Sequence, residues 1–476
     1  MTAARARLDL LSGPVAATLL RFALPTLVSS LLQSANASIN AIWIGRLLGP
    51  SALAATTNAS LLLFLLLAIV FGFGMAATVL IGQAIGRRDI DLARRLFGSA
   101  GGLFLILSLV TTAAGWIGTA TVLDLLATPA DVRPLALAYL RILFLGLPPM
   151  FLSVLLTMAL RGAGDAVTPM RFLALTVILD ILLNPLLILG VGPVPPLGIT
   201  GSALATLIAT SIGLAGLIGA IYRRDLPLRL RGAELRYLRP APSLLRLILA
   251  KGVPMGLQML VVSGSALVLI GLVNRYGVAT TAAYGAANQL WTYVQMPALS
   301  VGAAVSAMAA QNIGAGRWDR VNRIARAGIL INCAMTGLLV AGVMLQARPL
   351  LALFLGTAEP ALGVAVRMNE LVAWSWIPFG VSIVLTATVR ANGAVLVPLA
   401  ILFAALGPVK LGFALGFAGS LGADALWWSF PVASATSLVL SALYFWRGSW
   451  RGPALAESVA MPAAAAPVSV AAQPGS

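Results

Sequence analysis

Apolar runs long enough to cross a bilayer as a helix recur along the whole sequence. A spanning helix needs about 20 predominantly apolar residues. Apolar residues make up 60% of the chain and charged residues only 9%, and the alternating pattern of barrel strands is absent. The sequence therefore predicts an all-α integral membrane protein with twelve transmembrane helices, at approximately 14–37, 52–81, 96–119, 132–158, 168–190, 199–222, 244–273, 280–308, 324–346, 361–388, 395–417 and 425–446.

The net charge of +17 is concentrated in alternate loops. If the N-terminus lies in the cytoplasm, the basic segments 87–95, 223–243 and 316–326 all face the cytoplasm, and the opposite loops carry few basic residues. This positive-inside bias predicts that both termini are cytoplasmic. The charge thus orients the chain and does not indicate nucleic-acid binding. Only two of the 31 basic residues are lysine, as in GC-rich bacterial genomes, so we expect a bacterial inner membrane.

Several chemistries are excluded by composition. The chain has no histidine and one cysteine, Cys333, so neither an internal disulfide nor a Cys/His zinc site can form. A membrane-embedded enzyme would need a nucleophile with a base, a metal cluster or paired acids. We therefore expect no enzymatic activity and no cofactor.

The second half of the chain repeats the first at an offset of 228–229 residues. "GMAATVLIGQAIG" (74–86) aligns with "GAAVSAMAAQNIG" (302–314), and "LTMALRGAGDAVTP" (156–169) aligns with "LTATVRANGAVLVP" (385–398). Each half holds six predicted helices, so both enter the membrane in the same orientation, as parallel repeats with a cleft between them. The expected organisation is a cytoplasmic N-terminus (1–13), an N-lobe (14–222), a cytoplasmic linker (223–243), a C-lobe (244–447) and a disordered cytoplasmic Ala/Pro-rich tail (448–476).

One predicted helix contains the segment "VILDILLNPLLIL" (177–189), in which Asp180 and Asn184 lie four residues apart on one helix face. An ionisable side chain at this depth costs several kcal/mol unless it is paired or faces a cavity. The segment is therefore a candidate functional site.

The segments "LPTLVSSLLQSANASINAIWIGRLLG", "GQAIGRRDIDLARR" and "LRGAGDAVTP", with their partners in the second half, resemble the multidrug and toxic compound extrusion (MATE) family. The resemblance covers about residues 14–447. It implies a monomeric, V-shaped, twelve-helix antiporter that exports amphipathic, often cationic, small molecules against an inward flow of protons or sodium ions.

The resemblance also implies an ion-coupling site formed by Asn40, Asp180, Asn184 and Thr206. Asn40 stands where the family usually has an aspartate, and the family's Asn-then-Asp order in the fifth helix is reversed here. Asn40, Asn184 and Thr206 lie at similar depth in their predicted helices, and Asp180 lies one turn deeper. Their oxygens could hold a sodium ion, or Asp180 could hold a proton. One carboxylate instead of two leaves less charge to compensate a metal cation, which favours the proton.

A structural interpretation competes with ion coupling. Arg141 enters its helix to about the depth of Asp180, and the repeat equivalents of positions 141 and 181 are Glu370 and Lys410. The sequence thus also predicts two charge-swapped intramembrane pairs, Arg141–Asp180 and Glu370–Lys410, which would relieve the cost of burying their members.

The candidate substrate-cleft residues are polar or aromatic side chains at membrane depth. Aromatic rings can hold a planar cation, although membrane aromatics more often pack or lie at interfaces. An alternative function is that of a lipid-linked-oligosaccharide flippase of the same superfamily, which would place more basic residues in the cavity than Arg141 and Lys410. The cleft candidates are Gln33, Gln258, Trp291, Tyr293 and Trp374.

Overall fold

The computed structural model describes residues 9–125, 132–190, 195–356 and 360–452. Within them, every regular element is a helix. Eleven helical stretches are long and apolar enough to span a membrane, and a pair bent by 48° at Gly146 makes a twelfth if it is one span. The predicted all-α membrane class is confirmed, and its helix count agrees. The predicted segments 1–13 and 448–476 lie mostly outside the described residues.

The described part of the N-lobe contains seven helices, because the fourth predicted span breaks at Gly146 before two prolines. Proline fits at the start of a helix, so the chain begins a new helix there in a different direction. The helices are α1 (Val15–Leu48), α2 (Pro50–Gly86), α3 (Ile90–Leu125), α4 (Arg133–Leu145), α5 (Leu147–Gly162), α6 (Val167–Leu189) and α7 (Gly198–Arg223).

The C-lobe is interrupted in two further spans. The tenth predicted span contains a 3-10 turn, η4 (Ala373–Ser375), and the eleventh contains a π-helical turn, η5 (Ala405–Val409), which includes Pro408. The other elements are α8 (Pro242–Val273), η3 (Asn274–Tyr276), α9 (Val278–Gly314), α10 (Trp318–Leu345), α11 (Ala347–Leu355), α12 (Ala361–Val372), α13 (Trp376–Arg390), α14 (Leu396–Ala404), α15 (Lys410–Gly416), α16 (Ala418–Leu421) and α17 (Asp424–Arg447).

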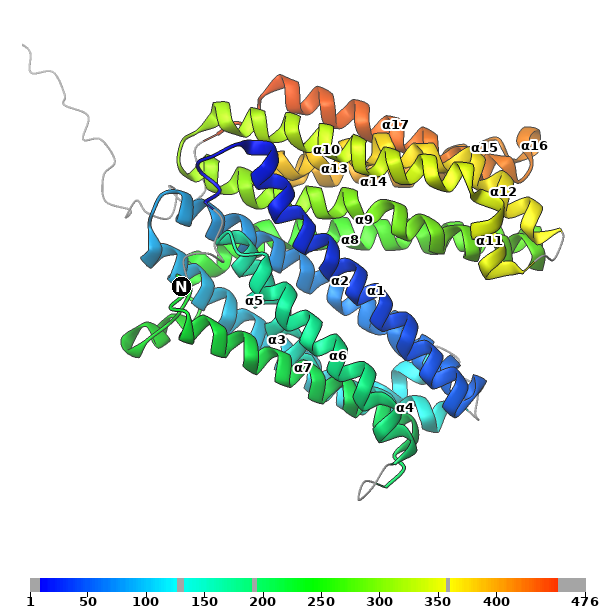
Figure 1. The fold of residues 1–476 in the computed structure, drawn as a ribbon, viewed down its shortest axis with the longest axis horizontal. Helices are drawn as coiled ribbons and strands as arrows, with labels where there is room; N and C mark the ends of the chain where they lie inside the picture. The colour runs from blue at the N-terminus through cyan, green and yellow to red at the C-terminus, as the bar shows by residue number, and fades with distance from the viewer. Residues whose placement is uncertain (1–8, 126–131, 191–194, 357–359, 453–476) are drawn as a thin grey trace, which may run out of the picture.

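The two lobes lie together at one end of the molecule and diverge toward the other (Figure 1). The first helix of each lobe crosses between them. Helix α1 packs against α6 of the N-lobe and against α9 and α10 of the C-lobe, and α8 packs extensively against α2. Both crossing helices contain a proline, Pro25 or Pro254, at equivalent positions. A movement of either helix would therefore change the packing in both lobes.

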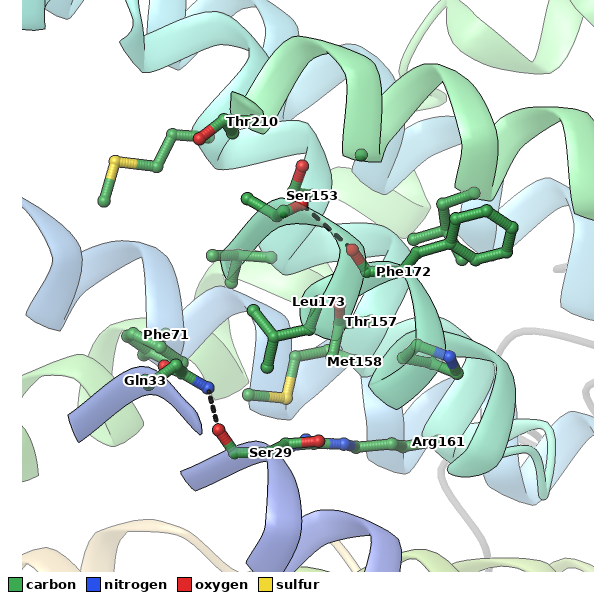
Figure 2. A pocket seen from close by; sticks show the side chains of 16 residues that line it. Ser29, Gln33, Phe71, Ser153, Thr157, Met158, Arg161, Phe172, Leu173 and Thr210 are labelled. Carbon is green, nitrogen blue, oxygen red and sulfur yellow. Dashed lines mark hydrogen bonds between the residues drawn. The ribbon is translucent and has the colours of Figure 1, made fainter. Parts of the chain in front are cut away.

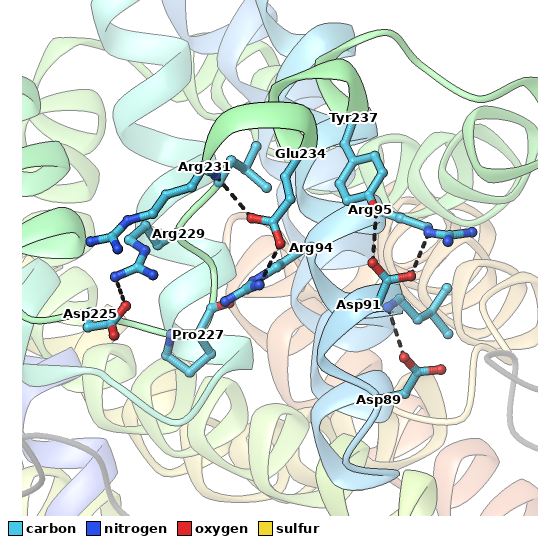
Figure 3. A network of polar contacts seen from close by, with 12 residues as sticks. Asp89, Asp91, Arg94, Arg95, Asp225, Pro227, Arg229, Arg231, Glu234 and Tyr237 are labelled. Atoms are coloured by element: carbon cyan, nitrogen blue, oxygen red, sulfur yellow. Dashed lines mark hydrogen bonds and ion pairs between the residues drawn. The ribbon is translucent and has the colours of Figure 1, made fainter.

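The segment that links the lobes docks onto the start of α3 through a polar network (Figure 3). The 3-10 helix η2 (Gly232–Leu238) supplies Glu234, whose Oε1 lies 2.6 Å from Arg94 Nη1. Arg94 also donates to the carbonyl of Pro227 at 3.0 Å, and the hydroxyl of Tyr237 donates to Asp91 at 2.8 Å. The predicted linker thus packs closely on the N-lobe. We call the end of the molecule that carries it the basic end.

At the basic end, two glutamines form reciprocal hydrogen bonds between the lobes. Gln83 of α2 donates to the carbonyl of Ala391 in the C-lobe at 2.7 Å, and Gln311 of α9 donates to the carbonyl of Gly162 in the N-lobe at 2.8 Å. Positions 83 and 311 are repeat equivalents, as are 162 and 391. The two contacts therefore obey the internal symmetry and close this end of the molecule.

Two glycines allow α2 and α9 to approach closely enough for these bonds. A Cβ atom on Gly86 would overlap the carbonyl oxygen of Gln311, and one on Gly314 would overlap that of Gln83. Glycine is therefore required at both positions while the basic end is closed.

Candidate ion-coupling site and substrate cavity

Asp180 is buried in α6, with 1% of its surface exposed, and both of its carboxylate oxygens accept hydrogen bonds. The amides of Asn36 and Asn40 donate to Oδ2 at 2.8 and 2.7 Å. The Thr206 hydroxyl and the Asn184 amide lie 3.0 and 3.2 Å from Oδ1. Side chains from α1, α6 and α7 thus converge on one carboxylate.

The structure brings together all four residues predicted for ion coupling and adds a fifth, Asn36. Asn184 also donates to the side-chain oxygen of Asn40 at 3.2 Å, so the amides contact one another as well as Asp180. Asn36 lies four residues before Asn40 and therefore on the same face of α1. This spacing was visible in the sequence, but no family pattern pointed to it.

The donor set suits an ionised carboxylate and can also adapt to a protonated one. The Thr206 hydroxyl is within reach of two acceptors, Asp180 Oδ1 and the carbonyl of Ser202 at 3.3 Å. It can therefore donate to Ser202 and accept a hydrogen bond from the O–H of a neutral Asp180. The side-chain oxygens of Asn36 and Asn184 are buried and have no partner among the described residues, so they are available to a cation.

The predicted pair Arg141–Asp180 is not formed. Arg141 is exposed on α4, and its guanidinium carbon lies 5.6 Å from the ring centroid of Trp116. The burial cost of Asp180 is instead offset by neutral donors, because four hydrogen bonds can stabilise a carboxylate without a partner charge. The prediction that Asp180 pairs with Arg141 was therefore wrong.

The predicted pair Glu370–Lys410 is also absent. Lys410 is buried, 6% exposed, and its Nζ lies 3.7 Å from the ring centroid of Phe430. Glu370 is on an exposed face of α12, with its nearest ion-pair atom 3.9 Å away on Arg367. The π-helical turn just before Lys410 adds a residue to one helical turn and so changes the direction of every later side chain. Sequence spacing alone could not account for that rotation.

A cavity of about 210 Å³ lies inside the N-lobe (Figure 2). It is lined by residues of α1, α2, α5, α6 and α7, and Arg161 is the one charged side chain among them. Thr176 and Thr210 line the cavity one helical turn from Asp180 and Thr206, and Gln33 lies three residues before Asn36. The cavity and the Asp180 site therefore adjoin along three helices.

Of the predicted cleft residues, only Gln33 lines this cavity. Gln258 is buried in the C-lobe and accepts a hydrogen bond from Arg390 Nη1 at 3.0 Å. Trp291 is fully buried, and its indole donates to Asn369 at 3.1 Å within an aromatic cluster that includes Phe430. Its place is thus in the core of the C-lobe.

The two remaining aromatic candidates lie elsewhere. Trp374 is 41% exposed in η4, and Tyr293 is half-buried, with its hydroxyl 3.5 Å from Gln289 Nε2. Neither is part of the N-lobe cavity. Hydropathy predicts the depth of these residues in the membrane but not the direction in which each ring points.

Two parallel bundles of spanning helices, with a buried polar site inside one of them, define the architecture of a secondary transporter. The MatE family model matches residues 25–186 and 254–415. The two matched segments are offset from each other by 229 residues, in agreement with the internal repeat. The chain therefore belongs to the MATE family, a family of transporters, and is a multi-pass membrane transporter rather than an enzyme.

Named relatives and solved structures agree with this assignment. The chain is 38% identical to "Probable multidrug resistance protein YoeA" of Bacillus subtilis over 89% of this chain and 92% of the relative. It is 31% identical to "Probable multidrug resistance protein YpnP" of the same organism, over 93% and 97%. A solved structure described as the outward-facing conformation of a multidrug resistance MATE family transporter shares its fold, with a TM-score of 0.85, 22% identity and coverage of 92% of this chain and 97% of that one.

Proposed function

We propose that this protein is a secondary active antiporter of the bacterial inner membrane, which exports amphipathic small molecules in exchange for protons or sodium ions. The observation that carries the proposal is the burial of Asp180 among neutral donors from three helices. A carboxylate in that environment changes its interactions sharply when it gains or loses a cation. The multidrug resistance names of the relatives support export as the direction of transport.

The Asp180 site couples ion binding to a helix that both lobes share. Asn36 and Asn40 hold α1 against α6 through charge-assisted hydrogen bonds. Neutralisation of Asp180 weakens both bonds, because a neutral carboxyl group is a poorer acceptor. Since α1 also packs on α9 and α10, release of α1 from α6 would be transmitted to the C-lobe. This is the differential interaction that alternating access requires.

The closed basic end supports an outward-facing arrangement. Under the positive-inside rule the basic end is cytoplasmic, and the glutamine bonds between the lobes close that side. The helices diverge at the opposite end (Figure 1). Export then requires these bonds to break so that the cytoplasmic side opens.

Both candidate ions have support at Asp180. The Thr206 hydroxyl can reverse its role when the carboxyl group is protonated. The unpartnered oxygens of Asn36 and Asn184 would suit sodium. The presence of a single carboxylate favours the proton, since a metal cation would be held by only one compensating charge.

The test is dye efflux from proteoliposomes containing the full chain. Ethidium efflux is measured with a pH gradient alone and with a sodium gradient alone, and compared with Asp180→Asn. We expect the pH gradient to drive efflux and the variant to lose it while folding normally. If only the sodium gradient drives efflux, sodium and not the proton is the coupling ion. Equal gradient-driven efflux by the variant would refute coupling at Asp180.

A further inference from the structure

Two repeat-equivalent arginines have different surroundings in the two lobes. In the C-lobe, Arg390 donates to the side chain of Gln258 at 3.0 Å. In the N-lobe, the equivalent of Arg390 is Arg161, and the equivalent of Gln258 at the same offset of 229 residues is Ser29. The Ser29 side chain has three fewer non-hydrogen atoms than a glutamine side chain, and its hydroxyl donates to the carbonyl of Pro25 at 2.8 Å. The N-lobe therefore has a cavity where the C-lobe has a hydrogen-bond acceptor.

The guanidinium of Arg161 faces this cavity. Ser29 and Arg161 both line it (Figure 2). The Nε of Arg161, like that of Arg390, is buried with no hydrogen-bond partner among the described residues, but only Arg390 has a glutamine acceptor for its Nη1. The lining carries no carboxylate, and its other polar groups are uncharged: Ser153, Thr157, Thr176, Thr210 and Gln33. A buried guanidinium without an anion is costly, so the cavity is suited to a ligand that supplies one.

We propose that the N-lobe cavity is a binding subsite for the carboxylate of an amphipathic substrate, with Arg161 as its charge partner and Ser29 as the residue that keeps the subsite open. The proposal rests on the transport function proposed above and specifies its substrate class. The transporter would thus prefer anionic or zwitterionic amphipaths over purely cationic ones. Guanidinium and carboxylate form strong, directed hydrogen bonds, which a neutral ester cannot replace.

The size and position of the cavity fit this role. At about 210 Å³ it is smaller than a pocket for a whole drug-sized ligand, so it accommodates a head group with one ring. Phe71, Phe172 and Met158 provide an apolar wall beside the polar groups. Asp180 lies one turn beyond the cavity residue Thr176 on α6. Its carboxylate already accepts hydrogen bonds from its own donors, so it does not pair with Arg161, which can bind an external anion.

A matched pair of dyes tests the preference directly. Rhodamine 110 carries a free carboxylate, and rhodamine 123 is its methyl ester, so the two differ only in the group at issue. Binding to the purified full chain is measured by fluorescence polarisation. We expect wild type to bind the acid at least about tenfold more tightly than the ester, the difference typical of one hydrogen bond to a charged group. Equal binding, or tighter binding of the ester, would overturn the proposal.

Three variants identify the residues responsible. Arg161→Gln should bring the two affinities within about twofold of each other. Ser29→Gln keeps the arginine but installs the acceptor of the C-lobe, and it should remove the preference in the same way. Arg390→Gln, the matched control, should retain it. If Arg161→Gln does not fold, Ser29→Gln decides, and a preference that survives in Ser29→Gln would contradict the proposal.

The same dyes separate this inference from the transport function. Gradient-driven efflux of the ester by wild type but not by Asp180→Asn, without any preference for the acid, would support antiport and refute the carboxylate subsite. A preference that depends on Arg161, without gradient-driven efflux of either dye, would support the subsite and refute antiport.

Discussion

The two lobes share a sequence repeat but differ where the Asp180 site lies. At the offset of 229 residues, the C-lobe equivalents of Asn40, Asp180 and Asn184 are leucine, valine and phenylalanine, at positions 269, 409 and 413. The C-lobe therefore has the same helical framework but lacks the carboxylate and the amides of the Asp180 site at the equivalent positions. Under the proposed function, ion coupling would therefore belong to one lobe, while the repeat would supply the symmetry of the movement.

The C-lobe also treats its buried charge differently. Lys410 lies against Phe430 in a cation–π contact, whereas Asp180 is surrounded by hydrogen-bond donors. The π-helical turn before Lys410 frees a backbone carbonyl, that of Leu406, which accepts a hydrogen bond from Ser265 at 2.9 Å. The ring of Phe430 stabilises the Lys410 ammonium group in place. It offers no oxygen ligands that could bind and release an ion from solution.

The largest expected difference between the lobes is in transport. Asp180→Asn should lower gradient-driven efflux by at least about a hundredfold, because a neutral amide cannot bind and release a proton. Lys410→Met, which keeps the apolar contact with Phe430 and removes the charge, should leave efflux within about threefold of wild type. Both are measured in proteoliposomes at equal protein content. Equal losses in the two variants would show that both lobes couple.

The glutamine bonds at the basic end should be equivalent, as the internal symmetry requires. Gln83→Ala and Gln311→Ala each remove a buried donor from a backbone carbonyl, so each should cost about 1–3 kcal/mol of stability. Thermal unfolding in detergent measures both. Gln289→Ala, which removes only a long contact with Tyr293, is the control and should have little effect. A cost confined to one of the two bonds would show that closure is not symmetric.

A smaller effect is expected at Arg141. Its contact with Trp116 is exposed, so Arg141→Gln should cost at most about 1 kcal/mol and leave efflux unchanged. The measurement combines thermal unfolding with the efflux assay. If Arg141→Gln strongly lowers stability and the double variant with Asp180→Asn regains it, the predicted ion pair, which the geometry excludes, would be reinstated.

The smallest effect concerns the linker. The pKa of Glu234 is held below its ordinary value, chiefly by the backbone N–H of Arg231 and further by Arg94. A depressed carboxyl pKa stabilises the folded state above the unfolded pKa, and this contribution disappears as the pH falls through the folded pKa. Glu234→Gln should therefore lower the unfolding temperature slightly at pH 7 but not in strong acid. An equal difference at both pH values would contradict this origin.

Much of this architecture could be predicted from sequence, because hydropathy and repeat spacing report directly on membrane spans. The Asp180 site was also within reach, since the family resemblance pointed to Asn40, Asn184 and Thr206, and these lie within about one turn of its depth. Rotation about a helix axis was not predictable. Lys410 follows a π-helical turn, and Trp291 points into the core. The cavity at Arg161 was missed because it depends on the absence of an acceptor at Ser29 rather than on the presence of a motif.

If Asp180 alone exchanges the coupling ion for substrate, as proposed, substrate binding should displace the ion from purified protein. Rhodamine 123 is added to purified protein, with released protons followed by a pH indicator and released sodium by a radioactive tracer in parallel. Because the linkage is reciprocal, wild type and Lys410→Met should each release about one cation per chain, and Asp180→Asn none. Release from Asp180→Asn equal to that from wild type would contradict the account.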